Sequence, residues 1–125
     1  MYRQRWGNKY GAKKTEYNGF RYDSKFEASI AQELDLRVKA GEILDYDRQY
    51  RVEIPLYDQR GLHLHTIRHK VDFRLHNPDG SFTLLEAKGV FTADYKMRRL
   101  FLEKFFLPNN LDYDYEVVTQ STRRR

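Results

Sequence analysis

Two acidic residues near the middle of the chain are spaced so that they can act together. Stretches rich in strand-forming residues flank Pro78-Asp79-Gly80, which is the pattern of a β-hairpin. A three-residue loop here places Asp72 directly opposite Glu86 on the neighbouring strand, and a four-residue loop places them diagonally. Like charges about 5 Å apart oppose folding unless something compensates them. Both registers therefore predict a divalent cation between the two carboxylates.

Lys88 adds an amine to this pair. It follows Glu86 by two residues, so both side chains project from the same face of the strand. The alternative is an exposed Glu86–Lys88 ion pair, which contributes little free energy, with Asp72 placed there incidentally. Apolar neighbours such as Phe73 and Leu85 indicate buried segments and favour the first interpretation.

Glu27 has two interpretations. Ser24-x-x-Glu27 is a capping box, in which the serine hydroxyl accepts from the Glu27 amide and the carboxylate returns to the Ser24 amide. In the second interpretation Glu27 is a third acid, carried by the first helix and directed at the hairpin. The local sequence by itself favours the cap.

Turn and capping signals divide the chain into short elements. Asn18-Gly19 is a strong hairpin turn, Gly41 ends a helix, and Thr92 begins another. The predicted segments are a hairpin at 15–22, helices at 23–40 and 93–106, and strands at 43–56, 62–75, 82–88 and 113–119. A change in apolar alternation also predicts a bulge or bend at 68–70. The order αβββαβ predicts an α/β fold with a mixed central sheet flanked by helices.

Each predicted helix has an apolar stripe at helical spacing, which we expect to be buried. The stripe of the first helix is Phe26, Ile30, Leu34 and Val38. The stripe of the second helix is Met97, Leu100, Phe101 and Phe105.

Length and composition indicate one compact domain. The chain has 125 residues, no cysteine and a net charge of +5. A chain of this length can bury a core without disulfides or a structural metal. We assign this single domain to residues 15–120. The lack of cysteine excludes disulfides and thiolate zinc sites. No apolar run approaches ~18 residues and no signal-peptide pattern follows Met1, so we expect a cytoplasmic protein with no membrane partner.

Positive charge is concentrated at the two ends. Residues 1–20 have a net charge of +4 and Arg123–Arg125 adds +3, whereas residues 21–122 have a net charge of −2. Such segments hold phosphate backbones, because each neutralised phosphate releases counterions. We therefore define a basic N-terminal arm at residues 1–14 and a basic tail at residues 121–125. The tail is explained equally well as a solvated segment that aids solubility.

The N-terminal arm suits contact with nucleic acid. It alternates aromatic rings, which stack on bases, with cations, which meet phosphates. The same rings could instead anchor the arm on the domain. The cations predicted to contact nucleic acid here are Arg3, Arg5, Lys9, Lys13 and Lys14.

The four histidines do not predict a zinc site. A zinc site needs three or four converging ligands, whereas the four histidines are spread along one extended strand. We expect them to face solvent or DNA. They are His63, His65, His69 and His76.

Taken together, these motifs resemble the PD-(D/E)XK nuclease superfamily. The resemblance is carried by Glu27 in the first helix, Asp72 on one strand, Glu86-Ala87-Lys88 on the next, and a following basic helix. The proline that usually precedes the aspartate is Val71 here.

A closer resemblance, over roughly residues 9–106, is to phage junction-resolving endonucleases of the endonuclease I type. It implies a restriction-endonuclease-like core, and it implies a homodimer because resolving a four-way junction takes paired cuts on two strands. The motifs that carry it are Tyr10-Gly11-Ala12-Lys13, Ser24-x-x-Glu27, Val71-Asp72-Phe73, Asn77–Gly80 and Leu85–Gly89.

The resemblance implies magnesium-dependent hydrolysis of DNA phosphodiesters, with Mn²⁺ as a substitute. Asp72, Glu86 and the Ala87 carbonyl would hold the metal, and Glu27 would contribute directly or through water. Lys88 would orient or activate the attacking water and offset charge on the phosphorane. The second-helix cations that would hold phosphates are Lys96, Arg98 and Arg99.

Two other classes of function remain open. Nicking, mismatch and transposition-end-cleaving nucleases of the same superfamily share these acids. A non-catalytic nucleic-acid-binding protein would use the basic segments and keep the acids as structural groups.

Overall fold

The computed structural model describes residues 14–120. The predictions for the basic tail and for the N-terminal arm, apart from Lys14, therefore lie outside the described residues. In chain order the elements are β1 (Thr15–Tyr17), β2 (Phe20–Tyr22), α1 (Lys25–Lys39), β3 (Asp45–Tyr57), β4 (His63–His76), β5 (Phe82–Lys88), α2 (Ala93–Phe101), η2 (Leu102–Phe106), η3 (Leu107–Asn109) and β6 (Tyr113–Thr119).

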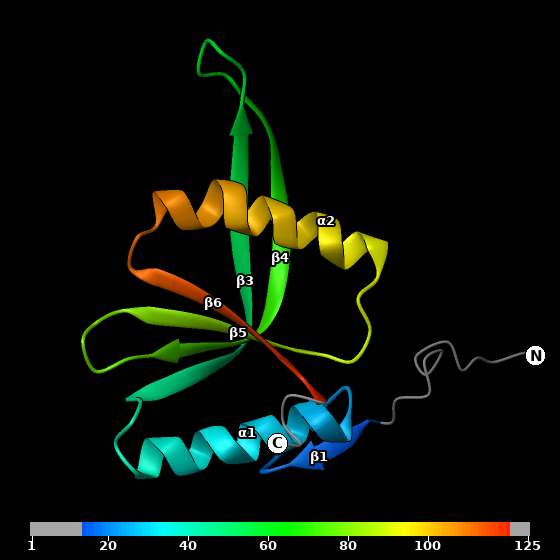
Figure 1. The fold of residues 1–125 in the computed structure, drawn as a ribbon, viewed down its shortest axis with the longest axis vertical. Helices are drawn as coiled ribbons and strands as arrows, with labels where there is room; N and C mark the ends of the chain where they lie inside the picture. Colours follow the sequence, from blue (N-terminus) through cyan, green and yellow to red (C-terminus); the bar gives the residue numbers. More distant parts are fainter. Residues whose placement is uncertain (1–13, 121–125) are drawn as a thin grey trace, which may run out of the picture.

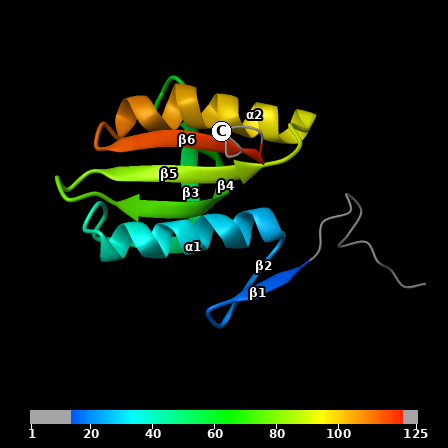
Figure 2. The same ribbon diagram turned by 60° about the horizontal axis from the view of Figure 1, so that its bottom comes forward.

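The central sheet has four strands in the order β3-β4-β5-β6. The β3–β4 and β4–β5 pairs are antiparallel and the β5–β6 pair is parallel, so the sheet is mixed. α1 and α2 lie on opposite sides of it (Figure 2). The predicted α/β fold with a mixed sheet flanked by helices is confirmed, with the element order αβββαβ following the small β1–β2 hairpin.

Local signals account for the start and end of α1. The Ser24 hydroxyl accepts from the Glu27 amide (3.1 Å), and Gly41 follows the helix at φ +81°, a conformation that glycine adopts without strain. In the preceding hairpin, Asn18 and Gly19 both have positive φ, as a two-residue turn of this kind requires. These parts of the fold follow directly from their sequence.

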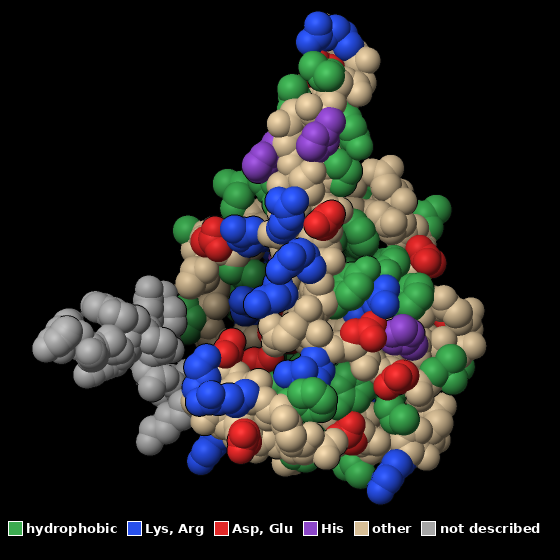
Figure 3. All heavy atoms as spheres, turned by 180° about the vertical axis from the view of Figure 1, so that it is seen from behind, with side chains coloured by type: hydrophobic (Ala, Val, Ile, Leu, Met, Phe, Trp, Pro, Cys, Tyr) green, Lys and Arg blue, Asp and Glu red, His purple; other side chains and the backbone are tan. Residues whose placement is uncertain are grey.

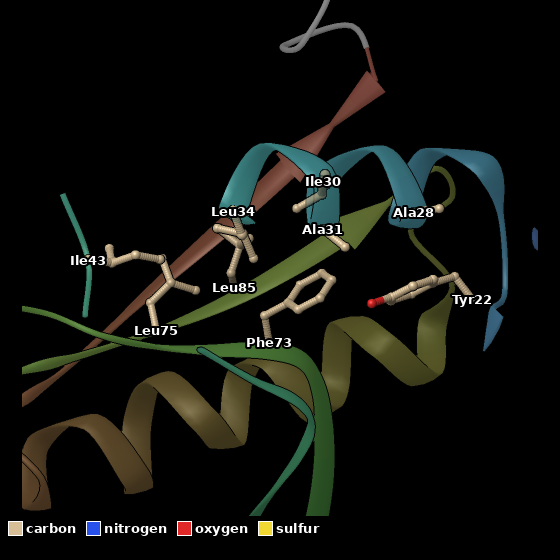
Figure 4. Packing of buried hydrophobic residues seen from close by; sticks show 9 residues of the cluster. All are labelled: Tyr22, Ala28, Ile30, Ala31, Leu34, Ile43, Phe73, Leu75 and Leu85. Carbon is tan, nitrogen blue, oxygen red and sulfur yellow. The ribbon is translucent and has the colours of Figure 1, made fainter. Parts of the chain in front are cut away.

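Two apolar cores lie on the two sides of the sheet. The core on the α1 side joins Ile30 and Leu34 of the helix to strand residues that include Phe73 and Leu85 (Figure 4). The other core lies on the α2 side and consists of Val52, Ile54, Val71, Leu84 and Leu102.

β4 contributes to both cores and changes sides at Asp72. Val71 belongs to the α2-side core, whereas Phe73 belongs to the α1-side core. Opposite Asp72 on β3, Gln49 has φ +55°, and the β3–β4 register is unbroken from Tyr50 to Leu56. The predicted bulge or bend is therefore not at 68–70 but at Asp72, where the strand must serve two layers.

α2 turns a face to the sheet that differs from the predicted stripe. Phe101 is partly buried, but the fully buried residues are Tyr95 and Leu102. The Tyr95 ring is buried while its hydroxyl lies 2.6 Å from that of Tyr115, so an amphipathic residue takes a core position. The exposed members of the predicted stripe are Met97, Leu100 and Phe105.

Within residues 14–120, no helix is both long and apolar enough to cross a membrane.

Candidate functional site

The site lies where β4 and β5 separate. The two strands are paired from His76↔Phe82 to Phe73↔Leu85. Beyond that pair β4 continues against β3, while β5 continues against β6. Asp72 and Glu86 are the next residues on the two strands, so they stand at the fork.

The predicted hairpin register is confirmed. The Asn77 amide donates to the Ser81 carbonyl (2.9 Å), and the Gly80 amide donates to the Asn77 carbonyl (3.0 Å). This is the three-residue loop, which is the register that aligns Asp72 with Glu86.

Asp72 bridges the fork through its side chain. Its Oδ2 accepts a hydrogen bond from the Ala87 backbone amide (2.7 Å). Burial raises the pKa of Asp72 to about 6; the Ala87 amide lowers it, repulsion by Glu86 raises it further, and attraction by Lys88 lowers it. Glu86 and Lys88 therefore both act electrostatically on the Asp72 carboxylate.

Glu86 is buried, with 2% of its surface exposed, and is held by two side chains. His69 Nε2 lies 3.1 Å from Glu86 Oε1. The Tyr115 hydroxyl donates to the same oxygen, and the Tyr95 hydroxyl lies 2.6 Å from that of Tyr115. Because Tyr115 donates to Glu86, Tyr95 must donate to Tyr115.

Both donors act on one carboxylate oxygen, and this leaves the other free. Glu86 Oε2 has no hydrogen-bonding partner among residues 14–120. An ionised Glu86 requires the proton of His69 to be on Nε2, and the buried Nδ1 has no partner in the described part of the chain. His69 therefore donates to Glu86 through Nε2.

A cavity of about 380 Å³ opens beside this network. Five cations and two acids line it, and Figure 3 shows Lys and Arg side chains around a hollow in which acidic side chains are visible. Lys88 lies in the lining with its Nζ 4.3 Å from the centre of the Tyr95 ring. The lining residues are Arg51, Arg68, His69, Lys70, Glu86, Lys88, Thr92, Asp94, Tyr95 and Arg98.

Glu27 is both a capping residue and a member of the acidic cluster. Its amide completes the serine half of the capping box, but its carboxylate accepts from Gln49 Nε2 (3.1 Å). Burial raises the pKa of Glu27 to about 7, and repulsion by Asp72 and Asp23 adds to the effect, while the Asp23 amide lowers it. The serine half of the predicted capping box is thus present, whereas within residues 14–120 the carboxylate is bonded to Gln49 and not to the Ser24 amide.

The acids form a row rather than a closed cage. Repulsion by Asp72 acts on Glu27, and repulsion by Glu86 acts on Asp72. Within residues 14–120 no three histidine or carboxylate side chains are arranged as a ready metal site. The donor set nevertheless fits a hard cation, because Mg²⁺ prefers carboxylate and carbonyl oxygens and because a cation would relieve the repulsion that adds to the effect of burial on the pKa values of Glu27 and Asp72.

The predicted phosphate-binding cations have different surroundings. Lys14 Nζ lies 2.9 Å from Asp23. Arg98 lines the cavity and donates to the Arg68 carbonyl, Arg99 pairs with Glu103 (3.1 Å), and Lys96 is exposed. The arm residues that lie outside the described part of the chain are Arg3, Arg5, Lys9 and Lys13.

The expectation that every histidine faces solvent or DNA is wrong for His69, which is 3% exposed. A signal for this was present in the sequence, because His69 lies between Ile67 and Val71 at strand spacing and so shares their buried face. Tyr95 and Tyr115 were also missed as partners of the site, because their hydroxyls meet only in the folded chain.

A family model described as "Protein of unknown function (DUF1064)" matches residues 7–121. The chain belongs to the DUF1064 family. No curated protein and no solved structure matches it. The inference about what this DUF1064 chain does therefore depends on the site at the β4–β5 fork.

Proposed function

We propose that this DUF1064 protein is a metal-dependent endodeoxyribonuclease of the PD-(D/E)XK type. The observation that supports it most is the fork itself, where Asp72, Glu86 and Lys88 interact beside a cavity lined by cations. Carboxylates that repel one another suit a cation, and the basic rim suits the phosphates on either side of a scissile bond.

Asp72, Glu86 and the Ala87 carbonyl are the groups that would hold Mg²⁺, with Glu27 contributing directly or through water. Once bound, the ion would act as a Lewis acid and lower the pKa of water, and Mn²⁺ is expected to substitute for it. Glu86 Oε2 has no partner within residues 14–120, and the two bonds to Oε1 fix its position, which supports this assignment.

Lys88 is the candidate for the group that positions the attacking water and offsets charge at the phosphorus. Its amine approaches the face of Tyr95, and none of the acids in residues 14–120 forms an ion pair with it. It therefore remains available to a phosphate. Arg98, with Lys96 and Arg99, would hold the neighbouring phosphates.

The resemblance to phage junction-resolving endonucleases narrows the proposed substrate to four-way DNA junctions. It also supports a homodimer, because two strands must be cut together. We place the activity in the cytoplasm, which for a phage protein means the cytoplasm of the host cell.

Incubation with a labelled four-way junction, with and without Mg²⁺, tests the proposal. Linear duplex and mismatched duplex serve as comparison substrates, and together they separate a resolvase from nicking and mismatch enzymes. Scission that requires the metal and is fastest on the junction is the expected result. No scission of any substrate at any Mg²⁺ or Mn²⁺ concentration would refute the enzymatic proposal.

Two substitutions link cleavage to the fork. Glu86→Gln and Lys88→Ala should each reduce the cleavage rate at least ~100-fold, because they remove the metal-holding and water-positioning groups, while junction binding remains. Glu116→Gln and Lys104→Ala are matched controls, since both residues are exposed and lie outside the cavity lining. Metal-dependent cleavage retained by both fork variants would contradict the assignment.

A second candidate is a non-catalytic nucleic-acid-binding protein. The hydrogen bonds to Glu86 favour it, since His69 and Tyr115 give the buried carboxylate a structural role without any metal. Titration with Mg²⁺ separates the two candidates: such a protein would bind the junction and would produce no scission.

A further inference from the structure

The cavity continues onto the outer face of a long two-stranded projection. We name this projection the β3–β4 ribbon and define it as residues 50–57 and 63–71. Figure 1 shows it extending past α2 and away from the body of the protein. Its inner face carries Val52 and Ile54, which are buried in the α2-side core, so along these residues only the outer face is open.

The pairing of the strands determines which side chains share that outer face. Arg51 is paired with Lys70, Glu53 with Arg68, and the next pair is Pro55↔Thr66. Directly paired residues project to the same side of a sheet. Arg51, Glu53, Pro55, Arg68 and Lys70 are all exposed, in agreement with this register.

Arg51 and Lys70 form a like-charge pair that folding alone does not explain. Like charges directly opposite each other on neighbouring strands destabilise a sheet. Arg68 has Glu53 at 3.4 Å, whereas no acid within residues 14–120 forms an ion pair with Arg51 or Lys70. Because no acid in this part of the chain neutralises the two cations, the pair points to an anion supplied from outside the domain.

The position of this pair indicates which anion. Arg51, Arg68 and Lys70 line the cavity together with Glu86 and Lys88. A phosphate chain with its scissile bond at the fork would meet the base of the ribbon first and then run along it.

The composition of the outer face distinguishes a duplex from a single strand. Proteins that hold single strands stack bases on aromatic side chains. Between Arg51 and Pro55 on β3, and between Thr66 and Lys70 on β4, the outer face presents cations, a glutamate, a proline and a threonine, and none of these stacks a base as an aromatic ring does. Tyr57 follows at the far end of the ribbon, where its ring contacts that of His63 edge-on, so no row of aromatic rings runs along the face. Such a face contacts phosphates without reading bases.

On the β3 side of the ribbon, the edge also argues against a second copy of the chain adding a strand. β3 is an edge strand, and Pro55 lies in its interior. Proline has no amide to donate and is a common means of blocking edge-to-edge pairing.

We infer that the outer face of the β3–β4 ribbon binds the phosphate backbone of double-helical DNA flanking the cut. This inference rests on the proposed function, since it takes DNA as the substrate. The six residue steps from Arg51 to Tyr57 span about 20 Å at 3.3 Å per residue. That length corresponds to about six base pairs of duplex.

Substitution of the like-charge pair tests the inference. Junction binding is measured by fluorescence anisotropy at several salt concentrations, with Ca²⁺ in place of Mg²⁺. The double variant Arg51→Gln/Lys70→Gln should bind about 10- to 100-fold more weakly near physiological salt, and its slope of log affinity against log salt should fall by about 2, or about 0.9 for each lost contact. Lys39→Gln is the control, an exposed cation at the far end of α1.

A shortened ribbon provides a second measurement. Leu56 and His65 are directly paired, so Asn-Gly can replace residues 57–64 and close the hairpin at that pair. The shortened protein should lose hydroxyl-radical protection over the outermost base pairs of one duplex arm, and circular dichroism checks that it remains folded.

Three outcomes would overturn the inference. A double variant with the same salt slope as Lys39→Gln shows that the pair contacts no phosphate. Equal affinity for a junction whose flank is single-stranded shows that no duplex is recognised. A change in molecular mass in solution, seen by light scattering in the double variant, shows that the face is an interface between copies. Wild-type protein that binds DNA but does not cut it would instead contradict the proposed enzyme and leave this inference standing.

Discussion

At the scale of single residues, the fixed position of Glu86 depends on side chains from three other elements. His69 comes from β4, Tyr115 from β6 and Tyr95 from α2. Groups that orient a metal-binding carboxylate typically change metal affinity about 10- to 100-fold when they are removed. Removing one of these hydrogen bonds should therefore weaken metal binding, which can be measured without a cleavage assay.

Tyr115→Phe should weaken Mn²⁺ binding about 10-fold or more, because it removes one of the two donors to Glu86 Oε1 and keeps the ring. Isothermal titration with Mn²⁺ in the absence of DNA measures this directly. Tyr57→Phe is the control, since Tyr57 is exposed on the β3–β4 ribbon. A Tyr115→Phe protein with unchanged Mn²⁺ affinity would show that the bond has only a structural role.

Glu27 gives a pH-dependent prediction. Because the folded state raises its pKa from 4.5 to about 7, the folded protein binds more protons than the unfolded chain between these values. The free energy of unfolding therefore falls as pH rises through that range. Glu27→Gln has no ionisable group at this position, so its free energy of unfolding does not fall in this way. The free energy of unfolding of the variant minus that of wild type should therefore increase by roughly 1–3 kcal/mol between pH 4 and pH 8.

Urea unfolding followed by circular dichroism at several pH values measures this difference. Glu16→Gln is the comparison, because Glu16 is exposed on β1 and its carboxylate is solvated in both states. If the free energy of unfolding changed with pH in the same way for wild type and Glu27→Gln, the folded protein would not disfavour the ionised form of Glu27.

At the scale of elements, α2 shows how packing overrides an apolar pattern. The sequence predicts a stripe of Met97, Leu100, Phe101 and Phe105, whereas the buried residues of this helical segment are Tyr95 and Leu102. Of the predicted stripe, only Phe101 packs against the α2-side core. A purely apolar stripe does not include Tyr95, because tyrosine can bury its ring while its hydroxyl is hydrogen-bonded.

The buried and the exposed residues of this helical segment predict losses of stability that differ in size. Leu102→Ala should lower the free energy of unfolding by about 2–5 kcal/mol, because it opens a cavity in the α2-side core. Met97→Ala should change it by less than about 1 kcal/mol, since Met97 is 54% exposed. Urea denaturation of the two variants provides the comparison, and equal losses would mean that the helix is rotated from the position described here.

At the scale of the whole molecule, charge is separated between a nearly neutral body and basic ends. Residues 21–122 have a net charge of −2, and residues 1–20 have a net charge of +4. Within the body, cations gather around the cavity. Binding of a polyanion should therefore depend on the N-terminal arm together with the rim of the site.

Deletion of residues 1–11 tests the contribution of the arm. The deletion removes three cations, Arg3, Arg5 and Lys9, so it should weaken junction binding and lower the salt slope by up to about 3. Anisotropy titrations over a range of salt concentrations measure both quantities. An unchanged slope would show that the arm makes no phosphate contacts.

The sequence by itself determined the features that depend on neighbouring residues. Asn18-Gly19 and Pro78-Asp79-Gly80 specify their turns through backbone conformation, and the hairpin register then follows by counting, which aligned Asp72 with Glu86. Ser24 and Thr92 specify helix starts for a similar reason. Each of these signals acts over a few residues, so no knowledge of the fold is required.

Only the tertiary structure decided which side chains surround the acids. The fork opens because β4 must pair with β3 while β5 pairs with β6, and no local pattern encodes that choice. Tyr115 reaches Glu86 across 29 positions of sequence, and the bend at Asp72 arises because β4 serves two cores. Contacts of this range depend on how the layers pack, and packing is a property of the whole chain.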